Sequence, residues 1–344
     1  MLGRLIDQLF PIHVDEPSEA AIVRNVQQRD ASLHLYDNSS PWGNWLPVFK
    51  SADLTLINLE TSATTHARKW PAKVFNYRMH PENIASLTTA GVSYAGLANN
   101  HTLDFCEQGL SDTVAALRKA QIPFAGAGDT REEALAPAVL SLGSHEVHVY
   151  AASDHPADWS KVPNFHLIDY GSSMRQQLKE TLLQRPRPGL KIFSVHWGPN
   201  YAWQPADELQ RLARFLVDEC EVDVIHGHSS HHVQGVEVYK GKPIIYGCGD
   251  FVDDYAVVDG GWRNDLSALW RLNVREMKSC EQTRLAVSNI EVFPNRIQNF
   301  VAHRLDAGDK DHKWVLDKVR HLSSGFGTRA RSGLGRDGQL VFNI

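Results

Sequence analysis

The chain has 344 residues, 42% of them hydrophobic and 22% charged, which are ordinary proportions for a soluble globular protein of one or two domains. Its formal net charge is -5 and its charged residues are scattered, which argues against a nucleic-acid-binding surface and a polybasic membrane patch. No apolar run approaches the roughly 20 residues of a membrane span, and no export signal opens the chain, so a cytoplasmic location is expected as written.

The first two thirds of the chain alternates apolar strand runs with helical periodicity. Strands are expected in the apolar runs that begin at residues 53, 92, 190, 222 and 244, and helices at 81–90, 108–120 and 206–220. This alternation predicts an α/β layered fold. The four cysteines are widely spaced and form no Cys-x-x-Cys pair, so neither a disulfide framework nor a cysteine zinc site is predicted.

The pattern changes after Gly235 to closely spaced strands that are typical of hairpins, at 236–239, 243–246, 266–274 and 283–293. Lys240-Gly-Lys242 is a predicted hairpin turn, and Gly260-Gly261 marks a loop. A charged helix is expected at 307–322 and a mobile surface tail at 323–338. The sequence therefore predicts one domain over 1–300, followed by a helix and tail over 301–344.

Each of the five strand runs ends in residues suited to metal binding or acid/base chemistry. The residues are Glu60, Asn99 to His101, His196, the histidines between 226 and 232, and Asp250. Because side chains at strand ends converge on one rim of a sheet, we expect a metal cluster there.

The strongest local signal is Gly227-His-Ser-Ser-His-His232, which directly follows the strand run Asp223-Val-Ile-His226, so that four histidines occur within the seven residues 226–232. Imidazoles leaving a strand through a tight turn can reach one ion. The alternative is a polar surface loop with capping serines, but the histidine density favours a metal site.

The other motifs have structural alternatives when each is taken alone. Asn99 and Asn100 are suited to metal ligation or equally to a turn and helix cap. Glu60 can bridge two cations, or form a salt bridge. His196 can be a ligand, or a core histidine with its ring nitrogens satisfied. Their combination favours the metal interpretation.

In this order, Asn58-Leu-Glu60, Ala98-Asn-Asn-His101, His196-Trp-Gly198 and Gly227-His-x-x-His231 resemble the capsule-synthesis protein A family (CapA, poly-γ-glutamate synthesis). This family is a branch of the calcineurin-like metallophosphoesterases. The resemblance runs from Met1 to about Tyr255. It implies a four-layer α/β/β/α sandwich with two divalent metal ions, Mn, Zn or Fe, at the strand ends.

Carried over residue by residue, the resemblance assigns metal binding to five side chains: Glu60, Asn100, His196, His228 and His231. His101 is then the acid or substrate-orienting group, and Asp104 fixes its tautomer. Arg4, Asn99 and Trp197 are expected to contact the substrate. Arg4 can clamp an anion or form a surface ion pair, and Trp197 can shape a cleft or cover the sheet edge.

Two departures from the family pattern stand out. Family members usually begin with a strand ending in Gly-Asp-Val-Met-Leu-Gly-Arg, whereas this chain starts inside that motif, at Met1-Leu-Gly-Arg4. Either the start is misplaced, with the first strand and a metal-binding aspartate upstream, or this form has a damaged site; we expect the misplaced start, because every later motif remains. A longer protein can be secreted or membrane-associated. Asp250 replaces a more usual asparagine and can compensate electrostatically for the aspartate.

Two functions follow from these observations. The first is a metal-dependent hydrolase of a phosphoester, or of an amide polymer such as poly-γ-glutamate, with a small anionic or polymeric substrate. The second is a non-catalytic component of a polymer synthesis or export assembly with a degenerate metal site. A serine hydrolase is excluded because the sequence has no Gly-x-Ser-x-Gly elbow, and Gly126-Ala-Gly-Asp129 lacks the third glycine of a dinucleotide fingerprint.

Overall fold

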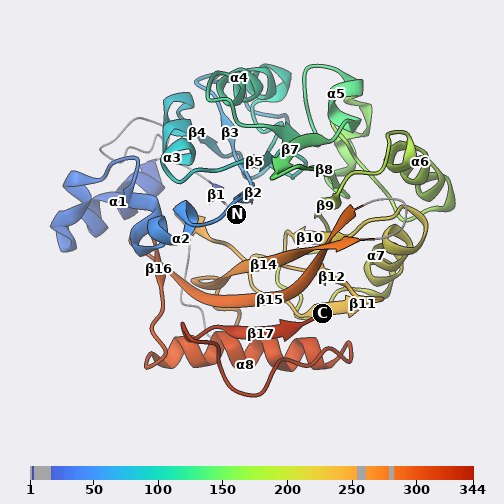
Figure 1. The fold of residues 1–344 in the computed structure, drawn as a ribbon. Helices are drawn as coiled ribbons and strands as arrows, with labels where there is room; N and C mark the ends of the chain where they lie inside the picture. Colours follow the sequence, from blue (N-terminus) through green and yellow to red (C-terminus); the bar gives the residue numbers. More distant parts are fainter. Residues whose placement is uncertain (1, 4–16, 254–260, 279–282) are drawn as a thin grey trace.

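The structure, a computed structural model, describes residues 2–3, 17–253, 261–278 and 283–344 (Figure 1). Its α-helices are α1 (Pro17–Arg29), α2 (Leu46–Lys50), α3 (Ile84–Thr89), α4 (Cys106–Lys119), α5 (Arg131–Leu135), α6 (Ser172–Leu183), α7 (Asp207–Glu219) and α8 (Lys310–Ser324). Short 3₁₀ helices are η1 (Ala31–Leu35), η2 (Ser40–Trp45), η3 (Pro81–Asn83) and η4 (Ala157–Lys161).

The largest sheet has six strands, in the order β11 (Val236–Tyr239), β12 (Lys242–Ile245), β10 (Val224–His228), β9 (Leu190–His196), β8 (His145–Ser153) and β7 (Ala138–Leu142). The four central strands are parallel, and the edge strands β11 and β7 pair antiparallel. Strand β9 is buried along its whole length. Four of its seven residues are apolar, and burial along the whole strand is expected for a parallel strand covered on both faces.

The remaining strands form smaller sheets. Long antiparallel strands β14 (Leu266–Lys278) and β15 (Thr283–Gln298) pair with each other, and β15 also pairs with β16 (Val301–Arg304) and β17 (Leu340–Asn343). A parallel sheet contains β2 (Leu56–Asn58), β5 (Tyr94–Gly96) and β6 (Phe124–Ala125). Two short parallel pairs are β3 (Ser62–Ala63) with β4 (Arg78–Met79), and β1 (Leu2–Gly3) with β13 (Val252–Asp253).

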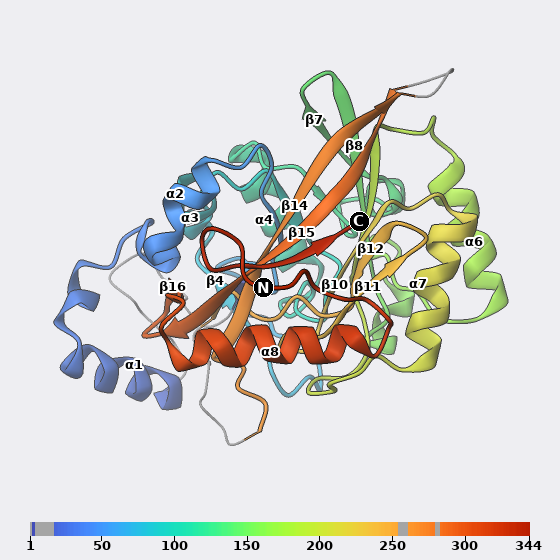
Figure 2. The ribbon, with the colours of Figure 1, turned by 60° about the horizontal axis from the view of Figure 1, so that its bottom comes forward.

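The sheets pack face to face with helices outside, which confirms the predicted α/β/β/α layering (Figures 1 and 2). Helices α6 and α7 cover one face of the six-stranded sheet through a core that includes Phe193, Val195, Leu212 and Leu216. The opposite face shares a second core with β5, β14, β15 and α8. Helices α3 and α4 pack on the outer face of β2 and β5 through a third core.

Most predicted elements in the α/β part lie within a few residues of the observed ones. The helix expected at 81–90 is η3 with α3, and those at 108–120, 206–220 and 307–322 are α4, α7 and α8. The hairpin turn between β11 and β12 is confirmed: Lys240 (φ 50°) and Gly241 (φ 75°) both adopt the left-handed conformation that a tight hairpin turn requires. The predicted loop at Gly260-Gly261 begins outside the described residues.

The C-terminal segment joins the body by strand pairing. Strands β16 and β17 both pair with β15, so the predicted boundary at residue 300 separates strands of one sheet. The stretch predicted as a mobile tail leads into β17, where Leu340 and Phe342 are fully buried. Among the described helices, none has both the length and the apolarity needed to cross a membrane.

Candidate active site

The ends of strands from two sheets meet at the predicted site. Strand β2 leads into Glu60 and β5 into Asn100 and His101, while β9 and β10 end at His196 and His228. In the six-stranded sheet, His196 and His228 are direct partners in the parallel register. A carboxylate oxygen of Glu60 lies 3.7 Å from Nδ1 of His196, which connects the two sheets. The strand-end rule therefore predicted this convergence correctly.

His196 and His228 form a directly hydrogen-bonded imidazole pair, with Nδ1 to Nδ1 at 2.9 Å. Nε2 of His228 lies 3.2 Å from the Ser194 hydroxyl, which also meets Nδ1 of His226 at 3.1 Å. Burial, followed by the charge of neighbouring histidines, holds the pKa values of His196 and His228 well below the usual range. Both rings are therefore neutral at pH 7, the form in which imidazole binds metal.

Glu60 is a buried carboxylate, 4% exposed, with only one oxygen engaged by a described residue. The Asn58 amide donates a hydrogen bond to its Oε2 at 2.9 Å, and Oε1 has no hydrogen-bond partner within the described residues. Burial raises the pKa of Glu60 to about 7, and the charge of His231 opposes this rise. A nearby cation would favour the ionised form.

His231 and Asp250 form a buried charged pair at the edge of the site. Nδ1 of His231 lies 3.1 Å from Oδ2 of Asp250. Burial disfavours the imidazolium, but the Asp250 carboxylate outweighs it and raises the pKa of His231 to about 9. His231 also has a φ of 61°, a conformation that histidine adopts uncommonly. Metal binding by His231 would require the imidazolium to lose one of its two ring protons.

His101 lies in a compact polar group with Asp104, Lys73 and Tyr77. Nδ1 of His101 is 2.6 Å from Oδ2 of Asp104, and Nζ of Lys73 is 2.5 Å from Oδ1. The backbone N–H of Tyr77 donates to the same carboxylate, and the Tyr77 ring stacks on the imidazole with centroids 4.1 Å apart. Asp104 thus fixes the orientation of His101, and leaves Nε2 as the ring nitrogen able to exchange a proton with a ligand.

The charge state of His101 follows from burial. Burial lowers the pKa of His101 to about 4, against the opposing effect of the Asp104 carboxylate. The free protein therefore holds a neutral imidazole at pH 7. An anionic group arriving at the ring opposes this shift, because nearby negative charge favours the imidazolium.

The two adjacent asparagines have different surroundings. The Asn99 amide nitrogen donates to Oδ1 of Asn58 and to the Leu59 carbonyl, and its Oδ1 accepts from the His101 backbone N–H. In contrast, Oδ1 of Asn100 is buried and has no hydrogen-bond partner among the described residues. Asn99 therefore positions the His101 loop, which explains it without the predicted substrate contact.

Replacing Asn99 by alanine is expected to lower the free energy of unfolding by about 2–3 kcal/mol, because it leaves buried partners on both neighbouring loops unsatisfied. Asn100→Ala is the matched control. We expect it to change the free energy of unfolding by less than about 1 kcal/mol, because Oδ1 of Asn100 accepts no hydrogen bond from the described residues. Urea denaturation of both metal-free variants measures the difference. Equal losses for the two variants would contradict the assignment.

The other two predicted substrate contacts are Trp197 and Arg4. Successive residues of an extended strand point to opposite faces, so with His196 on the site side Trp197 points the other way. Trp197 is 2% exposed in the core beside α7, where its indole N–H donates to the Tyr246 carbonyl at 2.9 Å. This placement favours a core role over the predicted substrate contact. Arg4 lies outside the described residues.

The fourth histidine of the cluster has a separate environment. His232 stacks on Trp262 with ring centroids 5.1 Å apart and lies 4.2 Å from the Trp203 ring. Its Nδ1 lies 3.1 Å from the Val233 carbonyl oxygen. His232 and Trp203 therefore belong to an aromatic cluster beside the site.

Sequence analysis missed a third histidine–aspartate pair, at the end of β8. Asp154 binds Nδ1 of His155, and its other carboxylate oxygen accepts from the Tyr170 hydroxyl at 2.5 Å and the Gly198 N–H at 2.8 Å. The His155 ring lies 4.9 Å from that of His196. The same strand-end signal was present, because the apolar residues 149–152 precede Ser153-Asp-His155.

Comparison with known proteins identifies the family. A model of the family described as "Bacterial capsule synthesis protein PGA_cap" matches residues 1–255. The chain belongs to this family. It is 35% identical to a "Probable polyglutamine synthesis accessory protein" of Mycobacterium tuberculosis, over 96% of this chain and 90% of the relative. The family predicted from the four motifs is thereby confirmed.

More distant capsule proteins match a smaller share of the chain. Capsule biosynthesis protein CapA of Bacillus anthracis is 27% identical over 74% of this chain and 61% of its own length. PGA biosynthesis protein CapA of Bacillus subtilis is 26% identical over 67% and 60%. Among solved structures, a novel phosphatase from Mycoplasma pneumoniae has a TM-score of 0.42 and 14% identity, and covers 88% of this chain and 92% of its own.

The predicted metal site contains several buried atoms of the types that bind metal ions. Across residues 2–3, 17–253, 261–278 and 283–344, no three His, Cys, Asp or Glu side chains are already arranged around one ion position. Three predicted ligands nevertheless hold buried donor atoms without a hydrogen-bond partner in this part of the chain: Glu60 Oε1, Asn100 Oδ1 and His196 Nε2. Because such atoms are costly to bury unpaired, and their types suit divalent ions, the residues fit a metal.

Proposed function

We propose that this capsule-family protein is a metal-dependent hydrolase that cleaves a phosphoester or an amide bond in a precursor or product of capsule polymer synthesis. The observation that carries the proposal is the set of buried metal-donor atoms without a hydrogen-bond partner in the described residues, Glu60 Oε1, Asn100 Oδ1 and His196 Nε2. Asn100 directly precedes His101 of the His101–Asp104 pair, and Glu60 lies 3.7 Å from His196. Unpaired donors next to an oriented acid/base pair are the combination that hydrolysis requires.

The metal would be held by side chains from both sheets, with Glu60 and Asn100 from one and His196 and His228 from the other. His231 completes the set once its proton is lost. When bound, divalent cations at such a site supply Lewis-acid stabilisation and activate a water at neutral pH. Mixed nitrogen and oxygen donors suit manganese, zinc or iron.

The residues around His101 account for proton transfer and orientation. Asp104 accepts from Nδ1 of His101 and so directs Nε2 toward exchange with the leaving group. Lys73 holds the Asp104 carboxylate in place through its contact at 2.5 Å, and Tyr77 restricts the imidazole by stacking. His101 is therefore the proposed proton donor to the leaving oxygen or nitrogen, once a bound anion has favoured its imidazolium form and Nε2 has taken up a proton. Lys73 and Tyr77 are positioning residues.

Metal content tests the first half of the proposal. Elemental mass spectrometry of the purified chain is expected to give about two equivalents of divalent metal, falling below about half an equivalent in a His196→Ala/His228→Ala variant. His145→Ala is the matched control, because His145 pairs with Glu276 on β14 and its loss should leave metal content unchanged. Equal metal in all three proteins would overturn the ligand assignment. No metal in the parent chain would favour a non-catalytic component of the polymer assembly.

A further inference from the structure

His155 and Asp154 directly follow strand β8, which lies next to the strand that carries His196. Ser153, the last residue of β8, is the register partner of His196 on β9. The Asp154 N–H donates to the His196 carbonyl oxygen at 3.0 Å, so contact between the two chain segments continues past the end of β8. The His155 and His196 rings lie 4.9 Å apart between centroids. His155 therefore belongs to the same rim as the predicted metal ligands, but the proposed function leaves it without a role.

The Asp154 carboxylate fixes the orientation of the His155 ring. One carboxylate oxygen contacts Nδ1 of His155, and the other accepts from the Tyr170 hydroxyl at 2.5 Å and the Gly198 N–H at 2.8 Å. Burial opposes ionisation of Asp154, but its hydrogen bonds from His155, Tyr170 and Gly198 outweigh burial and lower the pKa of the carboxyl. A carboxylate at Nδ1 holds the ring proton there and leaves a lone pair on Nε2, which is the usual arrangement of a histidine that binds metal.

The charge of His155 acts on three of the predicted ligands. Burial is the main cause of the low pKa of His196, and the charge of His155 is the largest electrostatic contribution after it. The His155 charge also acts, after burial, on the pKa values of Glu60 and His228. Because the interaction between charges weakens with distance, this shared influence places His155 close to all three side chains.

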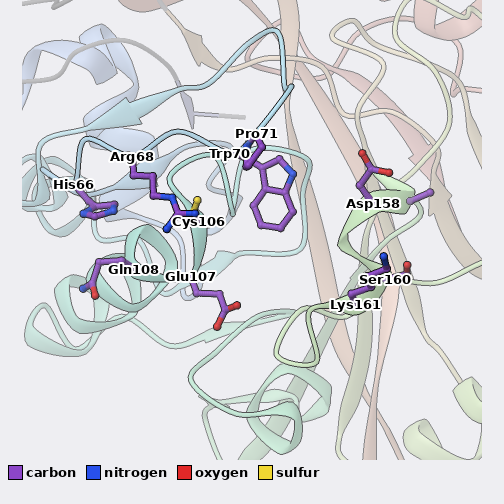
Figure 3. Close-up of a pocket in the computed structure, with 11 residues that line it drawn as sticks. His66, Arg68, Trp70, Pro71, Cys106, Glu107, Gln108, Asp158, Ser160 and Lys161 are labelled. Atoms are coloured by element: carbon purple, nitrogen blue, oxygen red, sulfur yellow. The ribbon is translucent and has the colours of Figure 1, made fainter.

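His155 is also the exposed member of this group. Its side chain is 31% exposed, whereas those of His196 and Glu60 are 1% and 4% exposed. The next residues form η4, which is one wall of an open pocket of about 830 Å³ (Figure 3). The loop over residues 66–71 and the first turn of α4 form the other wall. A partly exposed ligand beside such an opening gives an ion a path from solvent to the buried donor atoms.

We propose that His155 binds the divalent metal through Nε2 together with His196, and that Asp154 is the carboxylate that orients it. This inference rests on the proposed function, because it adds a ligand to the metal site of that hydrolase. Nε2 of His196 is buried and has no hydrogen-bond partner among the described residues, and an ion shared with His155 satisfies it. Asp154 is held in turn by Tyr170 and Gly198, so the ligand is supported from both β8 and the loop after β9.

Metal binding by the metal-free chain tests this ligand without any turnover. In a Mn²⁺ titration, His155→Ala is expected to weaken the affinity of the chain by roughly 10²-fold, and Asp154→Asn by about tenfold. His145→Ala is the matched control, because His145 begins the same strand and also pairs with a carboxylate, that of Glu276. Its Mn²⁺ affinity should equal that of the parent. Because the His155 ring is partly exposed, metal-free His155→Ala should keep the parent's circular dichroism spectrum.

Cobalt substitution distinguishes a metal ligand from a residue that only supports the neighbouring loop. In the Co²⁺-loaded protein, an imidazole bound to the ion gives a strongly shifted proton NMR resonance from its remaining ring N–H. His155→Ala should remove one such resonance, and His145→Ala should remove none. A weaker Mn²⁺ affinity in His155→Ala with every shifted resonance retained would overturn the assignment of His155 as a ligand.

The outcomes separate this inference from the proposed function. Loss of one shifted resonance and of Mn²⁺ affinity in His155→Ala, in a protein whose parent hydrolyses neither a phosphodiester nor an amide, would support the ligand and contradict the hydrolase. Unchanged Mn²⁺ affinity in His155→Ala would overturn the ligand even in an active enzyme. A parent chain that binds neither Mn²⁺ nor Co²⁺ would overturn both.

Discussion

Replacing His101 by glutamine is expected to lower kcat for a generic phosphodiester, such as bis(p-nitrophenyl) phosphate, by roughly 10²–10⁴. Asp104 orients the imidazole of His101, and glutamine keeps the polar character of the side chain but cannot transfer a proton. Because the change leaves the proposed metal ligands in place, metal content should stay at the parent value. Steady-state kinetics of the manganese-loaded proteins measures the effect.

The control for this variant is His145→Gln, which removes an imidazole far from the site, at the pairing of His145 with Glu276. Its kcat should equal that of the parent. A His101→Gln variant with parental kcat would contradict the assigned proton donor. A loss of kcat accompanied by a loss of metal would instead place His101 among the metal-holding residues.

The strand-end rule predicted the part of the site that depends on local sequence. Glu60, Asn100, His196 and His228 each follow or end an apolar strand, and parallel strands bring such positions to one rim regardless of loop detail. The layered fold was predictable for the same reason, since apolar runs alternate with amphipathic helices.

The alternation of side chains along an extended strand also indicates which face each residue occupies. His196 and Trp197 are neighbours in the chain, and alternation along an extended backbone sends one to the site and the other to the core. The alternation alone argues against Trp197 as a substrate contact. Asn99 and Asn100 show a limit of this approach, because only the hydrogen bonds to Asn58 and Leu59 distinguish the orienting amide from the unpaired one.

Other residues could not be found from local patterns. Lys73 and Tyr77 lie in an irregular stretch between β3 and β4, and they reach His101 and Asp104 only because that stretch folds back over the start of α4. Their positions depend on tertiary contacts that leave no periodic signal in the sequence. The same is true of the pocket, whose walls are about 50 to 90 residues apart in the chain.

Acid is expected to destabilise the protein strongly, because several imidazoles are buried in the neutral form. His166 offers the cleanest test, since it lies outside the predicted ligand set and its Nδ1 is 2.7 Å from the Ala151 carbonyl oxygen. Burial lowers the pKa of His166 to about 4 from 6.5, and the hydrogen bond to Ala151 opposes this shift only in part. In the folded protein the His166 imidazole therefore stays neutral at pH values where the same side chain in the unfolded chain gains a proton.

The sign follows from this difference in proton binding. Above pH 6.5 the His166 imidazole is neutral in both the folded and the unfolded state. Between about pH 6.5 and 4 only the unfolded state takes up a proton there. The free energy of unfolding therefore decreases as the pH is lowered, by about 3 kcal/mol for this imidazole. Urea denaturation of the metal-free protein at pH 7 and pH 4.5 measures the loss. In His166→Asn, whose amide can donate to the Ala151 carbonyl without titrating, the loss should be smaller by about 2–3 kcal/mol. Equal losses in parent and variant would show that His166 is protonated in the folded state.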